Sequence, residues 1–259
     1  MSNKPGSLRS VERAISVLEV LAARGEAGVT EVASEITVHK STAFRLLGAL
    51  EGGGLVEQTG HRGKYRLGFG LIPLAGAVSD RLDVVQQGRA VCTRLATELG
   101  ETVNVAVLRD HFVVNVDQAR GPSQVATHNW IGQLTPLHCT SSGKVLLAHL
   151  DPATRADLLV RVGTPRLTPR TETAAARLEE QLARVRETGY ATAVEEYEVG
   201  LNAVAAPVFD RSGQVVAAVS VSGPSYRLDE QRIRHVVGPL LASTAEISRR
   251  MGHRRRPVD

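Results

Sequence analysis

The spacing of apolar residues changes once along this chain, and that change constrains the fold more than any other feature. Over the first seventy residues the apolar side chains recur three or four positions apart, as on one face of a helix. From Glu101 onward they alternate, as in strands that bury one face. We therefore expect two domains, at 1–70 and 83–252, joined by a linker helix at 71–82 and followed by a basic tail at 253–259.

Composition indicates a globular protein that does not cross a membrane. Of the 259 residues, 42% are hydrophobic and 22% are charged, which excludes disordered and fibrous classes. No run approaches the roughly 18 apolar residues of a membrane span. The first ten residues lack the apolar segment of a signal peptide. We expect a cytoplasmic protein with no membrane partner.

The two cysteines predict neither a disulfide framework nor a metal site. Cys92 and Cys139 lie far apart in the chain, so we interpret both as buried, reduced thiols. The HExxH, GxSxG and GxGxxG motifs are absent. We expect no metal and no cofactor.

The N-terminal pattern is typical of a winged helix-turn-helix domain, which is mainly α. We expect a first helix with Ser10 as its N-cap, ending near Arg24, and two short helices at 30–36, capped by Thr30, and 41–50. Strands at 55–58 and 64–67 would enclose the wing loop 59–63.

The C-terminal pattern predicts an α+β domain with one antiparallel sheet flanked by helices. We expect hairpins at 102–108 with 112–116 and at 201–209 with 215–221. Helical segments are predicted at 143–150, 174–188 and 229–251.

The second short helix opens with polar and basic residues, as a recognition helix does where it meets base edges in the major groove. The net charge of +4 permits double-stranded DNA as a partner without requiring it. The alternative is a helical bundle with a solvated charged face, in which Phe44 would serve the core equally well. The candidate DNA contacts are Thr30, His39, Lys40, Ser41, Thr42, Phe44, Arg45, Arg62 and Lys64.

The segment 135–148 supports two functions from different classes. Ser141 and Lys144 have the S-x-x-K spacing of serine hydrolases that use a lysine, but the companion motifs S-D-N and K-T-G are missing. The other interpretation is a helix N-terminus at 140–143 whose free amides face a pocket and bind an anion. We keep a serine and lysine hydrolase as the alternative to a binding site.

Two further groups of polar residues receive structural interpretations. His138 is expected to be a buried histidine with a satisfied hydrogen bond. The acidic residues Glu195, Glu196 and Glu198 are expected to form a solvated loop, because no histidine or metal set accompanies them.

Taken together, these residues resemble the IclR family of bacterial transcriptional regulators along 7–252. The N-terminal motifs are SVERAISVL at 10–18, KSTAFRLL at 40–47 and YRLG at 65–68. The C-terminal motifs are PLHCTSSGK at 136–144, GY at 189–190, EE at 195–196, VAAPV at 204–208 and SVSGP at 220–224.

The resemblance implies a transcriptional regulator that acts as a repressor of a catabolic operon and binds a palindromic operator as a homodimer or homotetramer. It implies a GAF-like effector domain that binds a small organic or aromatic acid. The implied effector contacts are Asn104, Trp130, Ser141, Ser142, Ala193, Tyr197, Leu201 and Ala203.

Two of these positions depart from the family members that bind small keto acids. Those members resemble one another in an aspartate at the position of Ala193 and a cysteine at that of Ala203. The loss of both polar groups favours a bulkier or aromatic ligand. Trp130, with His128 and Asn129, would supply a stacking wall and a polar rim, while a core or interface role for Trp130 is the alternative.

Overall fold

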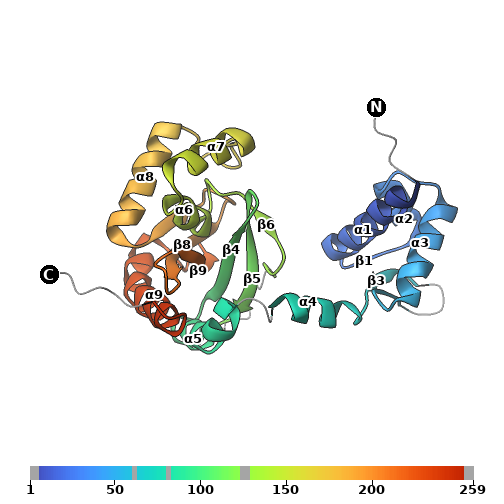
Figure 1. Ribbon diagram of the computed structural model, residues 1–259, viewed down its shortest axis with the longest axis horizontal. Helices are drawn as coiled ribbons and strands as arrows, with labels where there is room; N and C mark the ends of the chain where they lie inside the picture. The colour runs from blue at the N-terminus through green and yellow to red at the C-terminus, as the bar shows by residue number, and fades with distance from the viewer. Residues whose placement is uncertain (1–5, 60–62, 80–82, 123–128, 254–259) are drawn as a thin grey trace. The chain divides into compact units, whose positions relative to one another are not determined.

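The chain divides into two compact units, Met1–Arg81 and Leu82–Asp259, in the computed structural model (Figure 1). The structure describes residues 6–59, 63–79, 83–122 and 129–253. Arg62, His128 and the tail beyond residue 253 lie outside the described residues. Each unit has its own hydrophobic core.

The first unit is a small helical domain closed by a short sheet. Three strands pair antiparallel in the order β1-β3-β2. The core gathers apolar side chains from the helices and strands, among them Val17, Leu47 and Tyr65. The elements are α1 (Gly6–Arg24), β1 (Glu26–Ala27), α2 (Val29–Glu35), α3 (Lys40–Gly52), β2 (Val56–Gln58), β3 (Tyr65–Leu67) and α4 (Leu71–Ser79).

Two predicted helix caps are wrong, and a third strand was not expected. Ser10 lies inside α1, which begins at Gly6. Gly28, not Thr30, is the N-cap of α2, because its N–H donates to Glu31 Oε2 at 2.6 Å and Thr30 already lies in the first turn. The two-residue strand β1 is too short for an alternating pattern to reveal it.

The second unit is a six-stranded antiparallel sheet with helices on both faces. The strand order is β6-β5-β4-β9-β8-β7. Figure 1 shows α5 and α9 on one face and α6 and α8 on the other. The elements are α5 (Asp83–Leu99), β4 (Thr102–Arg109), β5 (Phe112–Ala119), β6 (Leu134–Thr135), α6 (Ser141–Ala148), α7 (Pro152–Val162), α8 (Ala175–Thr188), β7 (Ala191–Val194), β8 (Leu201–Phe209), β9 (Val215–Pro224) and α9 (Glu230–Arg250).

Strand alternation assigns the two faces of this sheet to different tasks. In β9, Val219 and Val221 belong to the core beneath α5 and α9. Ala218 faces the opposite way and packs with the α6 and α8 cluster. Further along the same face, Ser220 and Ser222 line a cavity instead of a core. The face covered by α6 is therefore part core and part pocket.

Candidate functional site

The N-terminal half of α3 presents an exposed polar surface. His39 is the N-cap, and its Nδ1 lies 2.9 Å from Ser41 Oγ. Ala43, Leu47 and Leu50 bury the opposite side of the helix. Most of the described candidates on and near this helix are accessible to solvent: Thr30, His39, Lys40, Ser41, Phe44, Arg45 and Lys64 are exposed, and Thr42 is half-buried.

Phe44 is not a core residue. Its side chain is 59% exposed, which removes the core interpretation left open by the sequence. Its exposed position on the polar face of α3 leaves the ring accessible to a partner.

The basic residues of the β2–β3 hairpin are partly paired within the domain. Lys64 Nζ donates to Glu26 Oε1 at 3.0 Å, and Arg66 Nε donates to Glu57 Oε1 at 2.6 Å. Hydrogen bonding to Glu26 raises the pKa of Lys64, so the ammonium stays charged. Both pairs are solvent-exposed and contribute little to stability.

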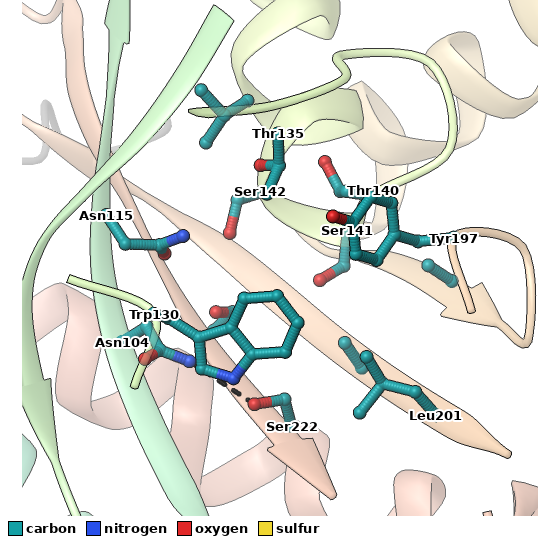
Figure 2. A pocket seen from close by; sticks show the side chains of 14 residues that line it. Asn104, Asn115, Trp130, Thr135, Thr140, Ser141, Ser142, Tyr197, Leu201 and Ser222 are labelled. Carbon is teal, nitrogen blue, oxygen red and sulfur yellow. Dashed lines mark hydrogen bonds between the residues drawn. The ribbon is translucent and has the colours of Figure 1, made fainter. Parts of the chain in front are cut away.

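The second unit contains a cavity that collects all eight residues predicted to contact an effector (Figure 2). Its volume is about 60 Å³. The predicted residues around it are Asn104, Trp130, Ser141, Ser142, Ala193, Tyr197, Leu201 and Ala203. Thr140, which also lines the cavity, belongs to the predicted helix N-terminus at 140–143, and five further lining residues were not predicted: Val113, Asn115, Thr135, Ser220 and Ser222.

One wall of the cavity is the N-terminus of α6. Thr140 is the N-cap, and its Oγ1 accepts from Gly143 N–H at 3.1 Å. The first intrahelical bond runs from Lys144 N–H to the Thr140 carbonyl at 3.0 Å. The amides of Ser141 and Ser142 precede that bond, so they have no acceptor within the helix. Such a terminus favours an anionic group.

The sheet supplies a polar floor opposite this helix. Asn104 on β4 donates through Nδ2 to Ser222 Oγ on β9 at 3.2 Å, as drawn in Figure 2. Asn104 Oδ1 is buried and has no hydrogen-bond partner among the described residues. An unsatisfied buried carbonyl costs about 1–3 kcal/mol, so this atom favours a ligand with a hydrogen-bond donor.

Aromatic side chains close another side of the cavity. The rings of Trp130 and Tyr197 meet edge to face, with centroids 6.0 Å apart. Burial raises the pKa of Tyr197, so its phenol stays neutral at physiological pH. The edge-to-face pair gives the cavity an apolar wall beside its polar floor.

The two positions at which alanine replaces a polar residue of the keto-acid-binding family members are paired in the sheet. Ala193 on β7 pairs with Ala203 on β8, and both methyl groups line the cavity. The walls at this point carry no polar group. The cavity therefore relies on its helix terminus and its floor for polar contacts.

The turn that carries Tyr197 is held by hydrogen bonds from the segment before α8. Thr168 Oγ1 donates to the Glu195 carbonyl at 2.7 Å, and Thr171 Oγ1 donates to the Glu196 carbonyl at 2.7 Å. Glu195 has a left-handed backbone with φ 54°, and its Oε1 accepts from Gly200 N–H at 2.8 Å. These bonds fix a strained residue and position the turn.

The expectation of a solvated acidic loop is wrong for Glu196. Its carboxylate is buried and accepts from Lys144 Nζ at 2.6 Å through Oε1, while the same ammonium donates to the Thr192 carbonyl at 3.1 Å. Desolvation raises the pKa of Glu196 and lowers that of Lys144. The mutual attraction of the two charges opposes both shifts. Sequence spacing had no signal for this pair, because 52 residues separate its members.

This ion pair also bears on the hydrolase alternative. A lysine that activates a serine must accept its proton, whereas Lys144 is committed to Glu196 and a backbone carbonyl. The arrangement around Ser141 is a helix terminus without a free base. It provides binding chemistry and no nucleophilic machinery.

His138 and the cysteines are structural, as predicted. His138 is buried, and its Nε2 lies 3.0 Å from the Pro165 carbonyl. Burial lowers the pKa of this imidazole. Cys92 and Cys139 are free and buried, and desolvation raises the pKa of each thiol to about 12.

The order of strands in the sheet brings together the pocket residues that sequence analysis did not predict. β4 lies between β5 and β9, so Asn104 neighbours Ser220 although 116 positions separate them in the chain. Alternation within β9 placed Ser220 and Ser222 on one face, but it did not identify which strand lies beside them.

The described segments lack both a membrane-spanning helix and a cluster of metal ligands. No helix there is both long enough and apolar enough to span a bilayer. Across 6–59, 63–79, 83–122 and 129–253, no three metal-ligating side chains come together.

Two family models match the chain. Residues 10–60 match the IclR helix-turn-helix domain, and residues 76–249 match the bacterial transcriptional regulator IclR C-terminal domain. Together they cover both units.

Named relatives match over nearly the whole length. The HTH-type transcriptional regulator KdgR of Escherichia coli (strain K12) is 32% identical over 253 residues, covering 98% of this chain and 96% of the relative. The HTH-type transcriptional repressor AllR of the same strain is 34% identical over 251 residues, covering 96% and 92%.

A similar solved structure contains a ligand. It is an IclR homolog complexed with 4-hydroxybenzoate, from Microbacterium hydrocarbonoxydans. The TM-score is 0.80 at 27% identity, and the match covers 93% of this chain and 98% of that one.

Proposed function

The chain belongs to the IclR family of bacterial transcriptional regulators, and from this premise we propose that it is a repressor released or retained by a small organic acid. It is a DNA-binding regulator and not an enzyme. The observation that carries the proposal is one cavity that joins the free amides of α6 to the unpartnered oxygen of Asn104.

On DNA, α3 acts as the recognition helix. Arg45 meets a base edge, Lys40 and Ser41 meet phosphates, and Phe44 contacts an apolar base surface such as a thymine methyl group. Lys64 and Arg62 of the wing add backbone contacts. Thr30, His39 and Thr42 complete the set.

The regulator acts as a homodimer or homotetramer on a palindromic operator in the cytoplasm, where it controls a catabolic operon. Two-fold symmetry in the protein matches two half-sites in the DNA. The GAF-like second unit, at 83–252, binds the effector, and the linker at 71–82 joins it to the DNA-binding unit at 1–70. Naming of AllR as a repressor supports the direction of control.

The effector carries a carboxylate and, at its far end, a hydrogen-bond donor. The carboxylate binds the amides of Ser141 and Ser142, and the donor satisfies Asn104 Oδ1. The apolar walls at Ala193, Ala203 and Leu201 complement the body of the acid. Binding of 4-hydroxybenzoate by the similar regulator supports this class.

The size of the effector cavity determines whether an aromatic acid can enter without movement of the surrounding side chains. The volume of about 60 Å³ is smaller than the roughly 150 Å³ cavity that holds benzene. An aromatic ring therefore requires Trp130 and Tyr197 to move apart.

The DNA-contact assignment is tested with a selected operator. Double-stranded DNA enriched from a random pool supplies the site, and gel-shift titration measures affinity. Arg45→Ala is expected to weaken binding about tenfold or more, since a good base contact contributes about 1–3 kcal/mol. Arg94→Ala, an equal change of charge on α5, is the control and should have little effect. Equal affinities for Arg45→Ala and the intact protein would contradict the assignment.

The effector assignment is tested by calorimetry with 4-hydroxybenzoate and benzoate. Ser141→Pro removes one amide at the first helical position, where proline is tolerated, and the preceding Thr140 is already extended. It is expected to weaken both acids about tenfold or more. Asn104→Leu should abolish the preference for the hydroxylated acid. If Ser141→Pro binds both acids normally, the carboxylate does not lie at this terminus.

A further inference from the structure

A second cavity lies outside the effector pocket, and the Lys144–Glu196 pair forms part of its lining. Its volume is about 260 Å³. It is bounded by α8, by the edge strand β7 and by the buried ion pair. The residues that line it and enter the argument are Lys144, Gln181, Arg184, Thr192 and Glu196.

Two acceptors around this cavity are buried and unsatisfied. Gln181 Oε1 and Glu196 Oε2 have no hydrogen-bond partner of good geometry among the described residues, although the backbone N–H groups of Val194 and Glu172 are near enough to Glu196 to lower its pKa. Glu196 is only 9% exposed. Each unsatisfied atom costs about 1–3 kcal/mol, so the cavity favours an occupant that donates hydrogen bonds.

The same cavity also offers hydrogen-bond donors. Lys144 Nζ carries three protons and uses two, on Glu196 and the Thr192 carbonyl. The Thr192 carbonyl points away from β8, because Glu195 N–H points toward β8 and directions alternate along the strand. The Thr192 N–H therefore also points outward, on the edge that no further strand covers.

The cavity has a cation at its exposed side. Arg184 lines the cavity from the surface of α8, and its guanidinium forms no ion pair within the described part of the chain. A free guanidinium beside a cavity favours a carboxylate, which it binds with two parallel hydrogen bonds.

We propose that this cavity is a second ligand site, distinct from the effector pocket, that binds a small aliphatic hydroxy acid. The carboxylate binds Arg184, and the hydroxyls donate to Gln181 Oε1 and Glu196 Oε2. A neutral donor suits Glu196 better than an ammonium, because Lys144 already neutralises that carboxylate.

The volume sets the size of the ligand. A water molecule occupies about 30 Å³ of liquid, so the cavity has room for on the order of eight waters. Glycerate, with three carbons, one carboxylate and two hydroxyls, fits this space and carries each required group.

A ligand bound at this site would influence the effector pocket through Glu196. Tyr197, the next residue in the chain, lines the effector pocket. A ligand bound to Glu196 therefore contacts the turn that positions Tyr197. If glycerate changes the affinity for the effector by some factor, the effector must change the affinity for glycerate by the same factor.

The test is calorimetric titration of the full chain with glycerate, propionate and glycerol. Propionate lacks the hydroxyls and glycerol lacks the carboxylate, so both should bind at least tenfold more weakly than glycerate. Gln181→Met and Arg184→Gln keep side-chain length and should each weaken glycerate at least tenfold. Ser141→Pro, which alters the effector pocket, should leave glycerate binding unchanged.

Three outcomes overturn the proposal. Absence of glycerate binding at millimolar concentration means that the cavity holds only water. Equal binding by the intact protein and both cavity variants places glycerate elsewhere. Loss in Ser141→Pro with retention in Gln181→Met assigns glycerate to the effector pocket. Unchanged operator affinity, and a melting temperature no lower than that of the intact protein, verify that Gln181→Met is folded.

Discussion

Removal of the Lys144 ammonium tests how the buried ion pair supports the effector domain. The substitution Lys144→Met keeps the length of the side chain and removes its charge. Glu196 then loses the ammonium that lies 2.6 Å from its Oε1, while its carboxylate stays buried. A buried charge that loses its partner costs about 3–5 kcal/mol. We expect a decrease of that size in the free energy of unfolding of the second unit.

The assay uses the single tryptophan of the chain. Trp130 lies in the second unit, so urea unfolding followed by its fluorescence reports on that unit alone. Arg94→Met is the matched control, because Arg94 pairs with Glu246 at 2.6 Å but is 57% exposed. An exposed pair contributes about 1 kcal/mol or less.

The direction in which stability changes with pH distinguishes an unpaired charge from lost packing as the cause of destabilisation in Lys144→Met. In Lys144→Met the isolated Glu196 has a pKa raised by burial, so the folded state binds a proton that the unfolded state lacks above the ordinary carboxyl pKa. Stability of this variant should therefore rise as the pH falls through the folded pKa. Glu196→Gln, added to Lys144→Met, removes the charge and should restore at least about half of the loss.

Two results would refute this reasoning. One is a loss in Lys144→Met no larger than in Arg94→Met, which would mean that the buried carboxylate finds other solvation. The other is a double variant no more stable than Lys144→Met, which would mean that lost packing, not unpaired charge, causes the effect.

Three further predictions concern stability. Burial lowers the pKa of both His138 and His149, so the unfolded state binds protons first as pH falls below about 6.5, and each histidine should lower stability there by at most about 1.4 kcal/mol per pH unit. Urea unfolding between pH 7.5 and 5.5 checks the claim, with His138→Asn as the variant that should lose the His138 share of the slope; an identical slope contradicts it. Thr37, in the turn before α3, has φ 53°, so Thr37→Gly should stabilise the first unit by roughly 1 kcal/mol in thermal unfolding, whereas Thr30→Gly inside α2 should destabilise it. A loss of stability in Thr37→Gly would show that the strain is absent. Gly143→Ala would bring Cβ to 2.3 Å from the Leu137 carbonyl oxygen and should cost about 1–3 kcal/mol, while Gly48→Ala, with open space around it, should stabilise α3 by about 1 kcal/mol; equal effects in chemical denaturation would contradict this account.

Local patterns in the sequence predicted most elements of secondary structure. Helical spacing identified the helices of the first unit, and alternation identified both long hairpins of the second. The misses were short or lacked a pattern: β1, β6, β7 and α7. The N-cap of α2 was misjudged because Gly28 donates its backbone N–H to the Glu31 side chain. This arrangement requires no particular side chain at the N-cap position.

The sequence by itself determined that this chain has a helix-turn-helix unit followed by an α+β unit, because both follow from periodicities within a few turns or strands. It also determined the polar start of α6, since N-caps are local. Only the tertiary structure decided that Asn104 meets Ser222 and that Lys144 meets Glu196. Those contacts join positions 118 and 52 residues apart, and pairing between distant strands is set by packing of the whole sheet.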